Sequence, residues 1–267
     1  MDPHVEYALA QYRPHVDHLV FVSPSVKELS PKLKTLVDCF VPRENIGYDF
    51  GSWRDGLLSL DTDRYEEVLF ANDSVYGPLW SPGPILEFGR ERDLDFWGMV
   101  MSDQTVSQGG ATPHIQSWFF SVRKRLIQAE AFQSFWKGIR AVDTKREIIQ
   151  RFEVGLTESV LRGGYSIGAV YAAKKSLIAR VRTAVREASM AELSRTWRLL
   201  RRSVRQNRNP SEGDWVEVLA SGVPFVKVSL LRLNPYGRNL ENAFRYLKEN
   251  STMDSRLIAN HLARIGS

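Results

Sequence analysis

The stretch ENIGYDFGSWRDGL, residues 44–57, places three aromatic side chains among glycines and acids, and EEVLFANDSVYGPL, residues 66–79, follows it after a short polar gap. The second stretch carries an apolar run that ends in Asn-Asp-Ser, which is typical of a buried strand closed by a polar turn. A glycine-containing loop, a helix and a buried strand therefore follow one another. In open α/β sheets, ligands bind at the carboxyl ends of the strands, so the residues after each strand are the candidates for a site.

Other short apolar runs bounded by turn residues predict further strands before residue 173. They are HLVFVSPS (18–25), DLDFWGMVMSD (93–103), IQSWFFSVRK (115–124) and YSIGAVY (165–171). Helical spacing predicts helices in DPHVEYALAQYRPHV (2–16), AFQSFWKGI (131–139) and KREIIQRFEVGLTESVLRGG (145–164), and PKLKTLVDCFVPR (31–43) is either a helix or a helix–strand unit. Because helices and strands alternate at close spacing, we predict an α/β fold, a Rossmann-type sheet flanked by helices.

The character of the chain changes after residue 173. The segment 174–208 is long, helical in its spacing and rich in arginine, and two further helices are predicted within 239–251 and 254–267. We therefore predict a domain over 1–173 and a basic, mainly helical extension over 174–267 packed on it. The arginine-rich helix either lies on an anionic membrane surface or is the solvated face of a packed helix.

Composition narrows the possible classes of protein. The chain has 267 residues, a net charge of +5 and one cysteine, Cys39. A single cysteine excludes an internal disulfide framework and suits a reducing compartment, and with five scattered histidines it makes a structural zinc cluster unexpected. We find no run of apolar residues long enough to span a membrane and no signal peptide. The basic balance indicates an anionic partner, such as a nucleotide, a nucleic acid or acidic lipid, or simply a basic protein.

Six motifs resemble the rhamnan synthesis protein F family of glycosyltransferases. They are RENIGYDFGSW (43–53), NDSVYGPL (72–79), DFWGMV (95–100), HIQSWFF (114–120), FEVGLTESVLRGGY (152–165) and NPSEGDWVEVLASGVPFVKVSLLRLNP (209–235). The resemblance implies a nucleotide-sugar transferase with a GT-A-like domain over 1–173, a rhamnosyltransferase that builds bacterial surface polysaccharide such as O-antigen or cell-wall glycan. It implies dTDP-L-rhamnose as the donor.

The donor site is expected where the loop at 44–57 meets the strand end at 72–74. Glycines there would let backbone amides approach a diphosphate at a helix start, although they could equally form a tight turn while the aromatics fill the core. The order of elements is also similar to the family-two glycosyltransferase plan, whose Asn-x-Gly loop fits Asn45 and Gly47. The predicted donor-binding residues are Asn45, Gly47, Asp49, Arg54, Asn72, Asp73 and Ser74.

That plan implies a catalytic base at an acid followed eleven residues later by a glycine, which here is Glu153 before Gly164. Such a base deprotonates the acceptor hydroxyl as it attacks the anomeric carbon, and the configuration inverts. We expect Glu153 at or near a helix N-terminus, facing the same cleft as Asp73. The alternative is an acid that only stabilises its own helix. Asp103, which follows a predicted strand, is the second candidate.

The metal motif of that plan is altered. Asp-x-Asp, which normally holds a divalent cation on the diphosphate, is replaced by Asn72-Asp73-Ser74. Either Asp73 takes over a Mg or Mn ion, or basic residues such as Arg54 carry the diphosphate. In a strand, neighbouring side chains point to opposite faces, so Asp73 faces the donor only if the turn swings it round.

A second departure is at the start of the chain. Members of the family usually begin with an apolar strand ahead of the first helix, and its end helps to hold the nucleotide base, whereas this sequence opens at MDPHVEY. We therefore expect the sheet to lack that strand, because of truncation or because the fold compensates.

The segment GGATPHIQSWFF, residues 109–120, is a candidate loop over the site. His114 and Gln116 would contact the acceptor or phosphate, and Trp118 would stack on a sugar. The alternative for His114 is a structural hydrogen bond. We also expect Phe50 and Trp53 to be buried on one helix face, the alternative being stacking on the base.

The sequence thus favours a cytoplasmic, membrane-peripheral, inverting glycosyltransferase that acts on a glycan or lipid-linked glycan. The alternative is a non-catalytic nucleotide- or glycan-binding domain of a larger polysaccharide-assembly protein, which the absent strand favours. A nucleic-acid binder is not expected, because no aromatic-basic motif of the known modules occurs.

Overall fold

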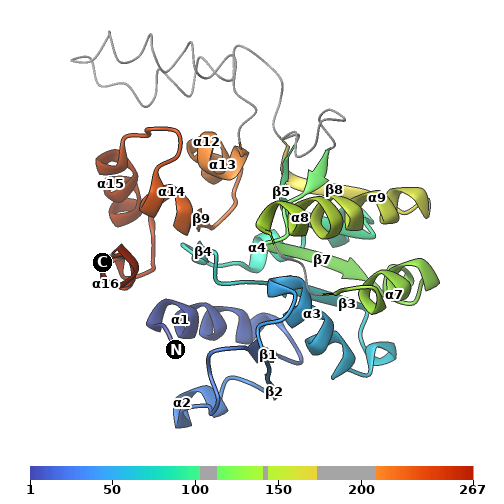
Figure 1. Cartoon of the computed structure of the whole chain (residues 1–267). Helices are drawn as coiled ribbons and strands as arrows, with labels where there is room; N and C mark the ends of the chain where they lie inside the picture. Colours follow the sequence, from blue (N-terminus) through green and yellow to red (C-terminus); the bar gives the residue numbers. More distant parts are fainter. Residues whose placement is uncertain (103–112, 141–143, 173–208, 267) are drawn as a thin grey trace.

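The computed structural model describes residues 1–102, 113–140, 144–172 and 209–266. Two parallel strands stand near the N-terminus, with Val20 opposite Cys39 in the ladder. The elements that build this part are α1 (Pro3–Tyr12), η1 (Arg13–His15), β1 (Val20–Ser23), α2 (Pro31–Lys34) and β2 (Cys39–Pro42). Within the described residues, β1 and β2 form a sheet of their own, at the lower part of the view in Figure 1.

The central sheet has five strands in the order β3-β7-β5-β6, and β8 also pairs with β5. It is mixed, because β8 runs parallel to β5 whereas β6 and β7 run antiparallel to it. Its strands are β3 (Glu67–Ala71), β5 (Phe96–Ser102), β6 (His114–Ile115), β7 (Phe119–Arg123) and β8 (Ile167–Ala172). Every strand predicted from the sequence forms.

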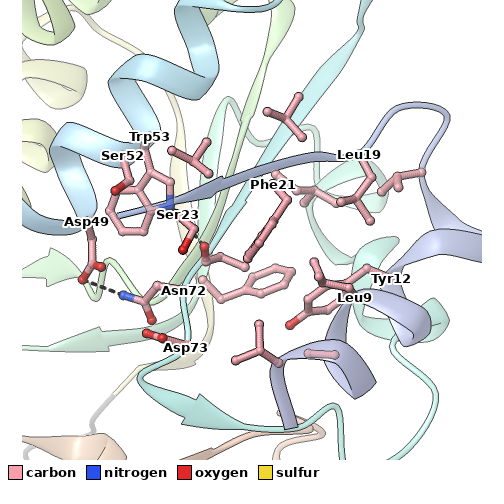
Figure 2. A pocket seen from close by; sticks show the side chains of 18 of the residues that line it. Leu9, Tyr12, Leu19, Phe21, Ser23, Asp49, Ser52, Trp53, Asn72 and Asp73 are labelled. Carbon is pink, nitrogen blue, oxygen red and sulfur yellow. Dashed lines mark hydrogen bonds between the residues drawn. The ribbon is translucent and has the colours of Figure 1, made fainter. Parts of the chain in front are cut away.

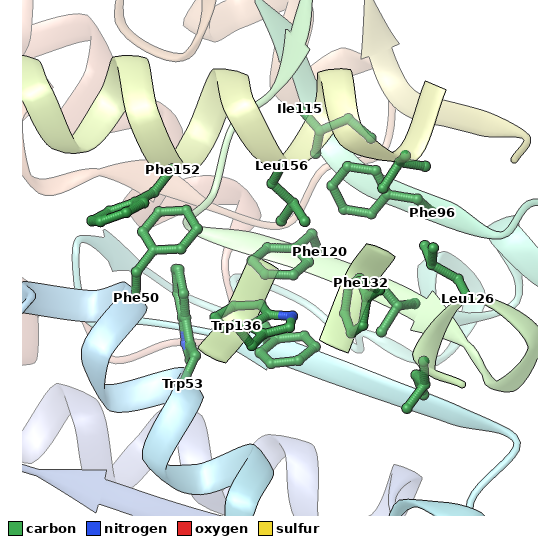
Figure 3. Close-up of a cluster of buried hydrophobic side chains, with 14 of the residues drawn as sticks. Phe50, Trp53, Phe96, Ile115, Phe120, Leu126, Phe132, Trp136, Phe152 and Leu156 are labelled. Carbon is green, nitrogen blue, oxygen red and sulfur yellow. The ribbon is translucent and has the colours of Figure 1, made fainter. Parts of the chain in front are cut away.

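An aromatic core fills the space between the central sheet and the helices on one of its faces (Figure 3). Phe50 stacks on Trp136 with ring centroids 5.9 Å apart, and Phe70 stacks on Phe120 at 4.6 Å. Phe50 is 1% exposed and Trp53 8%, so the prediction that both are buried is confirmed. The helices on this face are α3 (Tyr48–Leu58), α7 (Glu130–Lys137), α8 (Lys145–Ile148), the π-helical segment η3 (Ile149–Val154) and α9 (Gly155–Arg162).

The glycines of the opening motif have local roles. Gly47 is the N-cap of α3 and has a φ of +77°, a conformation that glycine adopts without steric cost. A β-carbon at Gly51 would collide with the carbonyl of Ile46, so the first turn of α3 packs against the loop only because Gly51 has no side chain. These glycines therefore make the tight turn that one of the two interpretations of the sequence required.

The C-terminal region is mainly helical and docks on the first part of the chain through one strand pair. β9 runs antiparallel to β4, with Val75 opposite Lys227. A second core joins Tyr76 and Leu79 to Trp215 and Leu230. The elements are β4 (Val75–Tyr76), α12 (Pro210–Gly213), α13 (Trp215–Ala220), β9 (Val226–Lys227), α14 (Val228–Leu233), α15 (Leu240–Asn250) and α16 (Ser255–Gly266).

Short helical segments complete the described part of the chain. They are η2 (Thr62–Arg64), α4 (Gly83–Leu86), α5 (Phe88–Glu91) and α6 (Lys124–Ile127). The side chain of Asn239 caps α15, because it accepts a hydrogen bond from the backbone amide of Asn242.

The α/β class is confirmed, with a mixed central sheet and β1–β2 as a separate parallel pair. The division at residue 173 stays a prediction, and the arginine-rich segment 174–208 lies outside the described residues. None of the helices in the described ranges combines the length and the apolar run that crossing a bilayer needs.

Candidate functional site

A cavity of about 500 Å³ lies between β1 and β3, with α3 and α1 on its other sides. Figure 2 shows side chains of α1, β1, α3 and the turn after β3 converging on it. Apolar side chains such as Leu9, Phe21 and Leu69 form much of its lining. One end, which we call the donor end, is polar and consists of Ser23, Ser25, Asn45, Asp49, Ser52, Asn72 and Asp73. The donor end lies where β1 and β3 finish and α3 begins, which is the position that ligands take in α/β folds.

A hydrogen bond joins α3 to the end of β3 at the donor end. The amide Nδ2 of Asn72 donates to Oδ2 of Asp49 over 2.9 Å, and Oδ1 of Asn72 accepts from the backbone amide of Ser74 over 3.1 Å. Asn72 therefore fixes both the carboxylate of Asp49 and the turn that carries Asp73. The predicted convergence of the loop at 45–49 with the turn at 72–74 is present in the structure.

The backbone is unusual where the loop enters α3. Tyr48 has a φ of 51°, which side chains other than glycine rarely adopt, and its side chain is exposed at the rim of the cavity. Asp49 lies in the first turn of α3, where the helix dipole favours a negative charge. Tyr48 and Asp49 therefore both present exposed side chains at the donor end.

Three predicted donor residues do not line the cavity. Gly47 is buried in the turn, and Ser74 donates through its Oγ to Oδ1 of Asn72 over 2.7 Å. Arg54 is directed elsewhere: it forms an ion pair with Asp55 over 2.8 Å and donates to the carbonyl of Ile139 over 3.1 Å. With its guanidinium committed to these partners, Arg54 is not placed to carry a diphosphate at the donor end.

A cation that the sequence analysis missed lies beside the donor turn. Nζ of Lys227 donates to Oγ of Ser74 over 3.1 Å and lies 5.7 Å from the ring centroid of Trp118. The pairing of β9 with β4 brings it there from 153 positions along the chain. No local motif marks Lys227 as a site residue. Its place beside the donor turn can be recognised only once the pairing of β9 with β4 is known.

Glu153 lies in a different environment. It sits inside the π-helical segment η3, within a helical stretch that begins with α8 at Lys145 and continues into α9, so it does not lie at or near the N-terminus of that stretch as predicted. Oε2 of Glu153 accepts from the amide of Ser117 over 2.7 Å and from its Oγ over 2.5 Å, and Oε1 lies 3.3 Å from Nε2 of His114. We call these three residues the Glu153 cluster. π-Helical turns inside α-helices are frequent at functional sites.

The Glu153 carboxyl is held ionised. Burial raises the pKa of Glu153, but the hydrogen bond and charge of His114 and the two hydrogen bonds from Ser117 lower it by more, so the pKa lies below its ordinary value. The side chain of Glu153 is 14% exposed and that of His114 is 2% exposed. The cluster is therefore charged but almost closed to solvent.

A short turn connects the Glu153 cluster to the donor end. Ser117, which binds Glu153, precedes Trp118, and the carbonyl of Trp118 accepts a hydrogen bond from the amide of Asn72 over 3.1 Å. Ser117 and Trp118 therefore connect Glu153 to Asn72 at the donor end. Glu153 itself is not among the residues that line the cavity.

The predicted acceptor-binding residues are buried. His114 contacts Glu153, Nε2 of Gln116 donates to Oδ1 of Asn209 over 2.7 Å, and the indole of Trp118 donates to Gln116 over 2.8 Å. Their polar atoms are engaged within the protein, so a role in acceptor binding stays a prediction. His114 makes the structural hydrogen bond that was its alternative interpretation.

The metal prediction also stays a prediction. Within the described residues, no group of three or more His, Cys, Asp or Glu side chains is placed to hold a metal ion. Asp73 lines the cavity as an exposed carboxylate, so a cation there would take its other ligands from the donor phosphates and water. Asp103 lies outside the described residues.

Comparison with known proteins shows which family the chain belongs to. The uncharacterized protein y4gN of Sinorhizobium fredii is 30% identical over 143 residues, 53% of this chain and 37% of that protein. The virulence protein VirA of Vibrio anguillarum is 28% identical over 206 residues, 75% of this chain and 64% of that protein, so the chain spans from about a third to two thirds of these relatives. No solved structure matches. The rhamnan synthesis protein F family matches residues 19–184, which include the donor end and the Glu153 cluster, and the chain belongs to this family.

Proposed function

We propose that the chain is the donor-binding and catalytic part of a glycosyltransferase that adds a sugar to a bacterial polysaccharide. The hydrogen bond of 2.9 Å between Asn72 and Asp49 carries the proposal, because it assembles a polar site from a strand end and a helix start. Membership of the rhamnan synthesis family supports glycosyl transfer, with L-rhamnose from dTDP-L-rhamnose as the transferred sugar. A GT-A-like arrangement would place this donor at the donor end.

The leaving diphosphate would need a positive charge beside the turn at 72–74. Asp73 would hold a Mg or Mn ion, which would supply positive charge to the leaving diphosphate. Lys227 lies 3.1 Å from Oγ of Ser74 and would add its own charge on the same side. In this assignment Lys227 takes the role that the sequence had suggested for Arg54.

Glu153 would be the general base. Its lowered pKa keeps the carboxylate ready to accept the proton of an acceptor hydroxyl, which would then attack the anomeric carbon with inversion. Because Ser117 and His114 now hold the carboxylate, the acceptor hydroxyl would replace at least one of them. The turn at 116–118, which joins Glu153 to Asn72, is the element whose movement would open this path.

A second function deserves a test, namely a non-catalytic domain that binds a nucleotide or a glycan. The burial of His114, Gln116 and Trp118 favours it, since these side chains offer no exposed surface to an acceptor. Such a domain would bind dTDP at the donor end and would leave dTDP-L-rhamnose intact.

Release of dTDP separates the two functions. The purified chain is incubated with dTDP-L-rhamnose, Mg²⁺ and a rhamnose oligosaccharide, and free dTDP is measured against time. A glycosyltransferase releases dTDP with turnover and extends the oligosaccharide. Binding of dTDP without release would support the non-catalytic function, and neither binding nor release would overturn both.

The cellular setting is part of the proposal. A lipid-linked glycan acceptor would bring the protein to the inner face of the membrane as a cytoplasmic, peripheral enzyme. The arginine-rich segment 174–208 would bind acidic headgroups there.

A further inference from the structure

The side chain of Gln116 joins the turn at 116–118 to the C-terminal region of the chain. Its Nε2 donates to Oδ1 of Asn209 over 2.7 Å, and its Oε1 accepts from Oγ of Ser211. Oε1 also accepts from the indole nitrogen of Trp118 over 2.8 Å. Gln116 and Ser211 are each 4% exposed, so water does not compete for these hydrogen bonds. One buried amide therefore ties the turn to the start of α12.

The partners of Gln116 require both ends of an amide. The indole of Trp118 can only donate, so it needs the oxygen of the glutamine. Oδ1 of Asn209 caps α12 by accepting from the backbone amide of Ser211 over 3.0 Å, so from the glutamine it can take only an N–H. A glutamate at this position would offer Asn209 no donor, and an apolar side chain would leave the buried indole nitrogen unpaired.

The residue that holds Glu153 lies between the two residues that this amide connects. Ser117 donates to Oε2 of Glu153 through its backbone amide over 2.7 Å and through its hydroxyl over 2.5 Å. Each residue has only two soft backbone dihedrals, so tying Gln116 to Trp118 leaves Ser117 little freedom to turn away. The amide of Gln116 therefore keeps both donors of Ser117 directed at the carboxylate.

The C-terminal region also reaches the turn through β9. Nζ of Lys227 lies 5.7 Å from the ring centroid of Trp118, where a cation is attracted to an indole ring. The same ammonium group donates to Oγ of Ser74 over 3.1 Å, and the amide of Val228 donates to the carbonyl of Ser74 over 3.0 Å. Trp118 thus contacts both Gln116 and Lys227, and both lead to the C-terminal region.

We propose that Gln116 is a positioning residue, through which the C-terminal region controls how Ser117 holds Glu153. Asn209 and Ser211 fix Gln116, Gln116 fixes the turn, and the turn supplies two hydrogen bonds to the carboxylate. Release of Gln116 from α12 would loosen Ser117 and open the carboxylate to an acceptor hydroxyl. The inference rests on the proposed role of Glu153 as the general base, and it gives Gln116 a role within the protein instead of a contact with the acceptor.

Titration of the Glu153 carboxyl in the intact chain tests the proposal. The groups that face this carboxyl are His114 and Ser117; burial raises the pKa of Glu153 and their hydrogen bonds lower it, so loosening Ser117 should raise it. The test variant is Asn209→Ser/Ser211→Ala. Serine at 209 still caps α12, but its shorter side chain withdraws the acceptor from Gln116. We expect the proton affinity of Glu153 to rise about tenfold, as measured from its side-chain ¹³C shift by nuclear magnetic resonance.

Folding of the double variant is checked by near-ultraviolet circular dichroism. If the double variant does not fold, Asn209→Ser and Ser211→Ala are measured separately. Each removes one of the two contacts between α12 and Gln116, so each should change the titration in the same direction by a smaller factor.

Two matched variants separate positioning from a general loss of structure. Asn209→Asp keeps both the cap of α12 and an acceptor for Gln116, so it should retain the wild-type titration of Glu153. Ser221→Ala removes a hydroxyl of α13 that donates to the carbonyl of Val218 over 2.7 Å, and it should leave that titration unchanged.

Amide hydrogen exchange gives a second readout of the turn. The amide of Ser117 donates to Glu153 and that of Asn72 donates to Trp118, so both should exchange about tenfold faster in the double variant. The amide of Arg123, which donates to the carbonyl of Asp95 over 2.9 Å further along the same strand, should be unaffected.

Two results would overturn the positioning role. One is an unchanged titration of Glu153 in a folded double variant, and the other is an equal change in Ser221→Ala or Asn209→Asp. Neither readout needs turnover, so the two proposals can fail separately. If Glu153→Gln keeps near-normal turnover while the double variant raises the proton affinity of Glu153, the base assignment fails and the positioning of the carboxylate stands.

Discussion

The donor end and the Glu153 cluster hold their carboxylates in opposite ways. Asp49 and Asp73 are exposed on a cavity, and Asn72 positions Asp49 with one hydrogen bond of 2.9 Å. Glu153 is enclosed by Ser117 and His114, with contacts of 2.5–3.3 Å to both oxygens. In the proposed reaction, a donor would reach Asp49 and Asp73 directly, whereas the proposed base would first exchange a protein partner for the acceptor hydroxyl.

The largest expected effect is on the proposed base. Glu153→Gln keeps the size of the side chain but removes the proton acceptor, so turnover should fall about 100- to 10,000-fold while affinity for dTDP is unchanged. Rates and dTDP binding are measured in parallel over pH 5–9. The control is Glu158→Gln, one turn further along the same helix, where the glutamate is exposed and pairs with Arg162. Near-normal turnover of Glu153→Gln would rule out the base and leave a structural role.

The next effect concerns the charge on the leaving group. Asp73→Asn should lower turnover about 100- to 1,000-fold if its carboxylate holds the cation that stabilises the leaving diphosphate. A Mg²⁺ titration checks the cause, since the variant should need more Mg²⁺ for half-maximal rate. Asp63→Asn, at an exposed carboxylate that accepts from Gln128, is the matched control. An unchanged Mg²⁺ requirement would transfer the role to Lys227, and Lys227→Met would then be the sensitive variant.

A smaller effect is expected from the hydrogen bond that assembles the donor end. Asn72→Ala frees Asp49 and the turn, and loss of a hydrogen bond to a charged group weakens binding about 10- to 100-fold. The dissociation constant for dTDP-L-rhamnose is measured by calorimetry, with Asn250→Ala on exposed α15 as control. Equal affinity of the wild type and Asn72→Ala would show that the donor binds elsewhere.

The smallest effect is on stability against pH. The pKa of Glu153 is lowered in the folded protein, so its contribution to stability is present above its ordinary value of 4.5 and is lost as pH falls through the folded pKa. The difference in Tm between the wild type and Glu153→Gln should therefore shrink between pH 7 and pH 3, as measured by calorimetry. A difference that stays constant across this range would mean that the carboxylate is not held ionised by Ser117 and His114.

Patterns of side chains predicted the elements, and long-range contacts decided the site. Apolar runs and turn residues are local signals, so strands such as β3 and the burial of Phe50 and Trp53 followed from the sequence. The position of Lys227 depends on a strand pairing with β4, which no local pattern encodes. Arg54 was assigned to the diphosphate by its place in a motif, yet Asp55 and Ile139 determine its direction.

The environment of Glu153 also depends on long-range contacts that local sequence patterns do not encode. An acid before a helical stretch suggested a helix start, but Ile149–Val154 form a π-helical turn within a longer helical stretch. Its carboxylate is held by Ser117 and His114, which lie in and just after β6, far from Glu153 in the sequence. The contacts of Gln116 with Asn209 and Ser211 likewise span 93 and 95 positions of the chain.

The most direct measurement is a titration of the ¹⁵N-labelled chain with dTDP-L-rhamnose, followed by nuclear magnetic resonance. The account predicts that the side-chain amide signals of Asn45 and Asn72 shift together with the donor concentration, while that of Asn250 does not. Shifts confined to Gln116 and Asn209, or no shift at Asn45 and Asn72 with saturating donor, would contradict the donor end as the nucleotide-sugar site.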